Sequence, residues 1–172
     1  MQQLCLTGSA PGVIAARLFN ALNVQPATLR IAPFDLDGAT AGDALYLYPP
    51  AIAQGVCCVP CRIRLTSEHA ALVPPVLEEV AVPALRAAMR VHSPILLDGL
   101  TAELLTCSPF AQAVCQCLQS ERAVVVTADD VAARMLRAAL PEPQLLCIAV
   151  PEDEAGRAAL LEMLIPEAAL RF

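Results

Sequence analysis

Runs of apolar residues without charge alternate along this chain with segments of helical periodicity. A strand that is buried on both faces is typically a continuous apolar run, and the sheet that contains it is usually parallel. Strands that alternate with amphipathic helices pack as a parallel sheet covered on both faces, with right-handed crossovers. The sequence therefore predicts an α/β three-layer sandwich in one domain that covers residues 1–172. The predicted buried strands are Gln3–Thr7, Pro94–Leu100, Arg122–Thr127 and Gln144–Val150.

Between the first strand and the central helices, the pattern changes. Thr28–Ala32 and Ala44–Tyr48 alternate as strands do, and the turn-forming pairs Asp37-Gly38 and Gly42-Asp43 lie between them. We expect an inserted β-hairpin there. The segment that follows, residues 54–67, indicates no element clearly, and Pro83 interrupts the helical pattern of residues 74–90.

Charge and composition exclude several classes of function. The net charge is −6 and no basic stripe exists, so a nucleic-acid partner is not expected. No basic cluster precedes an apolar run at the start of the chain, and the long charge-free stretch of residues 44–61 contains helix-breaking prolines. We therefore expect a cytoplasmic protein without a membrane partner. Because 57% of the residues are apolar and only 16% are charged, a protein partner or a homo-oligomer is expected to cover part of the surface.

The first strand and the helix after it have part of the spacing of a phosphate-binding loop. Such a loop runs from a strand through a glycine and four further residues to Gly-Lys-Ser/Thr. Here Gly8 follows the strand, and the three closing places are Val13, Ile14 and Ala15. The candidate phosphate-contacting residues are Gly8, Ser9, Gly12, Val13, Ile14, Ala15 and, one helical turn further, Arg17.

The residue types at these places do not suit a triphosphate. A working loop uses a Lys to neutralise the terminal phosphates and a hydroxyl to hold Mg²⁺. Ile14 and Ala15 supply neither, and the β-branched Val13 resists the backbone conformation of a glycine. All 11 basic residues of the chain are Arg, so no Lys is available from elsewhere.

Asp98 is the candidate for the second part of a nucleotide site. An acidic residue at the end of a neighbouring strand orients the magnesium shell in phosphoryl-transfer enzymes. Asp98 ends the run "PILLD", but Gly99 follows it where a hydrolase commonly has a Glu that positions water. An aspartate at a strand end is also an ordinary turn residue.

Several stretches, in the same order, resemble the small P-loop nucleoside-triphosphatase family of the cancer-related nucleoside-triphosphatase type. "LTGSAPGVIAARL" resembles its opening "ITG-x-PGVGKTTL", with one residue of slack, and "LEEVAVPALRAA" resembles its "FEE-[LV]-A-[IV]-P-x-L" helix. "PILLDGLTAELLTCSPFAQAV" is similar to its "VIIIDEIGKMEL-[FL]-S-x-x-F" segment. "RAVVVTADD" and "IAVPEDEAGRAALLEML" follow its late strand and last helix.

The resemblance implies a P-loop fold, with Asp98 and Glu103 at the positions of the family's acidic residues. It implies Mg²⁺ with ATP or GTP as ligands only if nucleotide binding is retained. The departures coincide with the groups that handle phosphate, and losing several charged or positioning groups together removes most of the catalysis they provide. The resulting hypothesis is a degenerate member that lacks hydrolysis and acts as a binding or interaction module. A weak nucleotide binder or residual nucleoside-triphosphatase is the first alternative.

The cysteines suggest a further alternative. Cys58 and Cys61 form a CxxC with Cys57 beside it and His69 eight residues on, which could supply four ligands to a metal or a redox pair. Incidental or packing thiols explain the same residues, because eight cysteines occur in the chain.

Overall fold

A computed structural model of the chain describes residues 2–33, 35–36, 39–40, 45–49, 58–64 and 70–171. The elements follow one another as strands and helices of moderate length. In order they are β1 (Gln3–Gly8), α1 (Pro11–Ala21), β2 (Ala27–Ala32), β3 (Asp35–Leu36), β4 (Ala39–Thr40), β5 (Leu45–Tyr48), β6 (Val59–Arg64), β7 (Ala70–Leu72), α2 (Pro74–Val76), the π-helical turn η1 (Leu77–Ala81), α3 (Val82–Arg90), β8 (Ile95–Leu100), the 3-10 turn η2 (Leu104–Thr106), α4 (Ser108–Gln119), β9 (Val124–Ala128), α5 (Asp130–Ala139), β10 (Leu145–Val150) and α6 (Glu154–Ala169).

In the part of the chain that the structure describes, the main sheet has eight strands in the order β10-β1-β9-β8-β2-β5-β6-β7. The first five are parallel to one another. The last three form an antiparallel meander that continues from β2. The predicted parallel strands and the pairing of β2 with β5 are therefore confirmed, whereas the turn-forming pairs between them, residues 37–38 and 42–43, lie outside the described residues.

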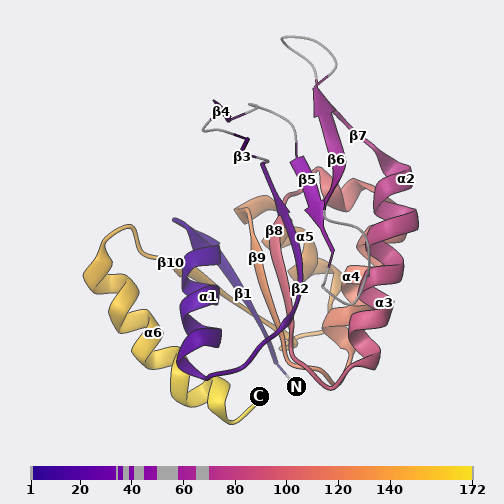
Figure 1. The fold of residues 1–172 in the computed structure, drawn as a ribbon. Helices are drawn as coiled ribbons and strands as arrows, with labels where there is room; N and C mark the ends of the chain where they lie inside the picture. The colour runs from indigo at the N-terminus through magenta and orange to yellow at the C-terminus, as the bar shows by residue number, and fades with distance from the viewer. Residues whose placement is uncertain are drawn as a thin grey trace.

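Helices cover both faces of the sheet (Figure 1). Helices α1 and α6 pack side by side on one face, and their apolar residues form a cluster with the β1 side chains Leu4 and Leu6. Helices α3, α4 and α5 cover the other face with a larger cluster that includes Phe110 and Leu97. This layered arrangement is the predicted three-layer sandwich.

The buried strands owe their charge-free sequences to this double covering. All five residues of β9 are buried, as are the first five of β1. Helix α5 begins at Asp130, because the Asp129 side chain caps it and accepts a hydrogen bond from the Ala132 N–H, 2.6 Å away.

The interruption predicted at Pro83 takes the form of a π-helical turn. The Val82 N–H bonds to the Leu77 carbonyl five residues earlier, in place of the usual four. Pro83 has no N–H to bond back along the helix, so the wider turn directly before it keeps the helix axis continuous into α3.

The two ends of the described chain lie close together at the end of the sheet where β1 begins (Figure 1). There the Arg171 guanidinium donates a hydrogen bond of 2.7 Å to the Gln2 carbonyl. Among the described residues, none of the helices combines the length and the apolar character that crossing a bilayer requires.

Candidate functional site

The connection between β1 and α1 is much shorter than the sequence spacing suggests. Only Ser9 and Ala10 separate Gly8 from the start of α1 at Pro11. Pro is favoured in the first helical turn, because its fixed φ suits a helix and its missing N–H is not needed there. Gly12 therefore lies inside the first turn of the helix, and no wide loop remains between the strand and the helix.

The backbone of this connection is tightly constrained. Gly8 has a φ of 83°, and a Cβ atom there would lie 2.9 Å from the Val150 carbonyl oxygen on β10. Ala10 has a φ of 48°, in the left-handed region that disfavours residues other than glycine. The chain thus turns sharply between strand and helix.

The three residues in the closing places of the phosphate loop belong to α1. Ile14 and Ala15 are fully buried and pack with Leu6 and Leu18 in the cluster beneath the helix. Val13, by contrast, is 46% exposed to solvent. Two of the three closing places are therefore occupied by core residues, and the roles of all three residues as nucleotide ligands stay predictions.

Asp98 lies at the carboxyl end of the parallel strands, next to the start of α1. Its Oδ1 accepts a hydrogen bond of 2.6 Å from the Thr127 hydroxyl, and its Oδ2 lies 3.5 Å from the Arg30 Nε. A Cβ atom on Gly12 would lie 2.8 Å from the same Oδ1. The carboxylate is therefore held by β9 and β2 and packed against the first turn of α1.

Thr127 connects Asp98 to the residue that follows it. The Thr127 oxygen accepts a 2.8 Å hydrogen bond from the Gly99 N–H while its hydroxyl donates to Asp98. Gly99 has a φ of 87°, and a Cβ atom there would lie only 2.0 Å from the Ile31 carbonyl oxygen. A glutamate cannot stand at position 99 unless the backbones of β8 and β2 move apart.

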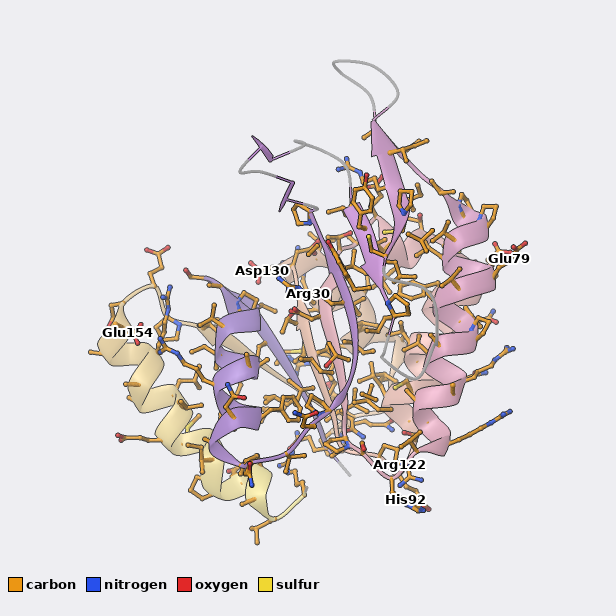
Figure 2. The ribbon with its side chains drawn as sticks, viewed as in Figure 1. Arg30, Glu79, His92, Arg122, Asp130 and Glu154 are labelled. Carbon is orange, nitrogen blue, oxygen red and sulfur yellow. The ribbon has the colours of Figure 1, made fainter. Side chains whose placement is uncertain are left out.

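An open cleft of about 740 Å³ lies between the start of α1 and strands β2 and β8. Its volume is typical of small-molecule sites. Most of its lining is apolar, and Asp98 and Arg30 supply its charges. Figure 2 shows Arg30 near the upper end of the parallel strands, and 60% of its side chain is exposed. The lining residues are Ala10, Pro11, Gly12, Val13, Ala16, Thr28, Arg30, Ile31, Ala32, Pro33, Leu96, Asp98, Gly99 and Thr127.

Arg17 and Ser9 are engaged by α6 and do not line this cleft. The Arg17 guanidinium forms an ion pair with Glu154, which Figure 2 shows at the start of α6. The Arg157 Nη2 donates a 2.8 Å hydrogen bond to the Ser9 hydroxyl, and its Nε donates to the Pro151 carbonyl. Contacts from the start of α6 therefore hold the β1–α1 connection and the first turns of α1 in place.

Glu103 is also placed away from the cleft lining. Its Oε2 lies 2.9 Å from the Nε of Arg62 on β6. The structure thus brings Gly12 and Asp98 together but places Glu103 against the antiparallel meander. Its predicted catalytic role stays a prediction.

The two described residues of the CxxC motif have different surroundings. Cys61 is buried, its thiol lies 3.4 Å from the Leu45 carbonyl oxygen, and burial raises its pKa to about 11. Cys58 is half-buried, and Cys57 and His69 lie outside the described residues. Within the part of the chain that the structure describes, no group of three or more His, Cys, Asp or Glu side chains is placed to hold a metal ion.

Sequence reasoning missed Arg30, Thr127 and Arg157. Thr127 was open to prediction, since the carboxyl ends of parallel strands meet at one edge of a sheet and Thr127 ends a predicted strand, as Asp98 does. In the sequence, Arg30 occupies an outward-facing place in an alternating strand, so nothing local indicates that it pairs with Asp98. Arg157 reads as an ordinary helix residue, so its contact with Ser9 has no local signal.

The chain was compared with known proteins. No protein-family model matches it, and no curated protein matches it in sequence. Its structure is similar to the crystal structure of THEP1 from the hyperthermophile Aquifex aeolicus, with a TM-score of 0.66 and 13% sequence identity over 97% of this chain and 98% of that one. This likeness shows the fold: the chain has a P-loop NTPase-like α/β fold, with a mostly parallel sheet and helices on both faces.

Proposed function

We propose that this protein is a P-loop NTPase-like protein that does not hydrolyse nucleoside triphosphates and that acts as a binding module through the cleft beside α1. One observation carries the proposal. Helix α1 begins at Pro11, so Ile14 and Ala15 are buried in its core-facing side where a working loop has its phosphate-binding groups.

The electrostatics of the cleft support the same conclusion. A bound triphosphate requires cations around its terminal phosphates. Arg30 already lies beside the Asp98 carboxylate, Arg17 is paired with Glu154, and the chain contains no Lys. In the absence of Mg²⁺, phosphates in this cleft would also be repelled by the negative charge of Asp98.

The lining favours a ligand of low net charge. It is largely apolar, and the neighbouring Asp98 and Arg30 offer one acceptor and one donor group side by side. A small uncharged molecule with its own donor and acceptor fits this chemistry, and so does a side chain of a protein partner or of a second copy.

The direct test is calorimetric titration of the folded protein with ATP and GTP, each with Mg²⁺, together with a measurement of phosphate release. We expect no binding heat up to millimolar nucleotide and no release above the buffer blank. Binding in the micromolar range would overturn the proposal.

A weak nucleotide binder with residual hydrolysis is the second candidate, favoured by the position of Asp98 against the first turn of α1. If this candidate is right, the protein should release phosphate slowly from ATP or GTP, and Asp98→Ala should abolish the release. The matched control is Arg134→Ala, an exposed residue on α5 that does not line the cleft. Release that persists in Asp98→Ala would identify a contaminating enzyme.

A further inference from the structure

Cys5 and Cys147 lie directly opposite each other on neighbouring strands. Strands β1 and β10 are parallel, and the register pairs Cys5 with Cys147. Both side chains face the same apolar cluster, beneath α3, α4 and α5. Neighbouring strands are about 4.8 Å apart, within the range of Cα separations that a disulfide spans.

The Cys147 thiol also affects the ionisation of the Cys5 thiol. Burial raises the pKa of the Cys5 thiol strongly, and the neighbouring Cys147 raises it further. Cys5 therefore stays a neutral thiol at ordinary pH.

The two sulfurs differ in their access to solvent. Cys5 is fully buried, whereas Cys147 is half-buried and lines a cavity of about 180 Å³. The cavity also contains Arg137 and Glu142, which form an ion pair at its edge. A water molecule occupies about 30 Å³ in the liquid, so a small hydroperoxide fits in this cavity.

We propose that Cys5 and Cys147 form a dithiol site that a hydroperoxide converts into a disulfide between β1 and β10. The Cys147 sulfur attacks the hydroperoxide oxygen, the O–O bond breaks, and Cys147 becomes a sulfenic acid while one water or alcohol leaves. The Cys5 sulfur then attacks the Cys147 sulfur. The S–O bond breaks, the sulfenic hydroxyl leaves with the Cys5 proton as water, and the disulfide forms.

The surroundings favour a disulfide over a thiolate or a metal thiolate. A disulfide carries no charge, so the apolar cluster around Cys5 imposes no desolvation penalty on it. In the strand pairings among the described residues, the register pairs Cys5 with Cys147 and places no cysteine opposite Cys61 on β6.

Trypsin makes the test unambiguous, because the chain has no Lys and is cut only after Arg. The tryptic peptides 1–17 and 138–157 contain Cys5 and Cys147, respectively, as their only cysteines. The folded protein is treated with stoichiometric hydrogen peroxide, alkylated, digested without reductant and analysed by mass spectrometry. We expect a crosslinked species joining these two peptides, which dithiothreitol separates.

The matched control is Cys115→Ser, a half-buried cysteine on α4 that should leave the crosslink unchanged. Cys147→Ser should abolish the crosslink and leave Cys5 free for alkylation after unfolding. The proposal is overturned if peroxide leaves Cys5 as a free thiol while Cys147 is unmodified or is oxidised to the sulfinic acid. This result is read on the native sequence, so it does not depend on how the variants fold.

Discussion

Replacing Gly99 with alanine tests the account of the strand junction beside Asp98. Gly99 has a φ of 87°, and an added Cβ would lie 2.0 Å from the Ile31 carbonyl oxygen. Cβ atoms essentially never lie within 3.0 Å of another heavy atom, so β8 and β2 must separate locally by about 1 Å. The Ile31 carbonyl oxygen is a backbone atom, so no side-chain rotation relieves the contact.

The expected loss of stability follows from the interactions that this movement affects. The left-handed conformation costs a residue other than glycine about 1–2 kcal/mol. The Gly99 N–H bond to Thr127 and the adjoining β2–β8 pairing contribute about 1 kcal/mol per hydrogen bond. Alanine also lowers the conformational entropy of the unfolded chain, which offsets about 0.4–1 kcal/mol of this loss of stability. We expect the free energy of unfolding of Gly99→Ala to fall by about 2–4 kcal/mol.

The assay is urea unfolding at equilibrium, followed by far-UV circular dichroism, with thermal unfolding alongside. For a chain of this size the loss corresponds to a fall in Tm of about 5–15 °C. Gly12→Ala is the comparison, because the atoms nearest to its added Cβ belong to the Asp98 side chain rather than to backbone, and alanine favours the helix by about 1 kcal/mol. If Gly99→Ala is as stable as the native protein, the close contact between β8 and β2 is wrong.

Three further substitutions or conditions test other parts of the fold. Gln3→Leu should lower the free energy of unfolding by about 2–4 kcal/mol, because the buried Gln3 amide bonds to three backbone groups of the α4–β9 connection, and thermal unfolding measures the loss. Asp129→Ala should lower it by about 1–2 kcal/mol through loss of the α5 cap, and an unchanged urea midpoint would show that the cap contributes nothing. Burial raises the pKa of Cys61 to about 11 and of Cys117 to about 12, so the folded state holds these protons more tightly than the unfolded state. Stability should therefore be complete below about pH 8.5 and fall as the pH rises toward these values, and urea unfolding from about pH 8 to pH 10 should show a smaller loss in Cys61→Ala.

The parallel part of the sheet could be predicted because burial on both faces leaves a direct trace in the sequence. Strands β1, β9 and β10 read as charge-free apolar runs, and β8 does so up to Asp98, since helices cover both faces of the sheet. The meander strand β6 leaves no such trace. It contains Pro60, Arg62 and Arg64 and lies between β5 and β7, away from the parallel core.

The candidate site was harder to predict, because spacing in a sequence does not say where a helix begins. Counting from Gly8 places Val13 at the end of a loop, but Pro11 starts the helix two residues earlier. The signal was present, since a proline after a turn is typical of a first helical residue. The contact of Asp98 with Thr127 depends on how β8 and β9 align, and no short motif encodes this alignment.

The hydrogen bond from Arg171 to the Gln2 carbonyl brings the first and last described residues together at the end of the sheet remote from Asp98. A short peptide could therefore link residues 2 and 171, and new ends could be opened elsewhere on the surface. For the same reason, a sensor chip or a fluorescent fusion attached at either end would leave the cleft open to a ligand.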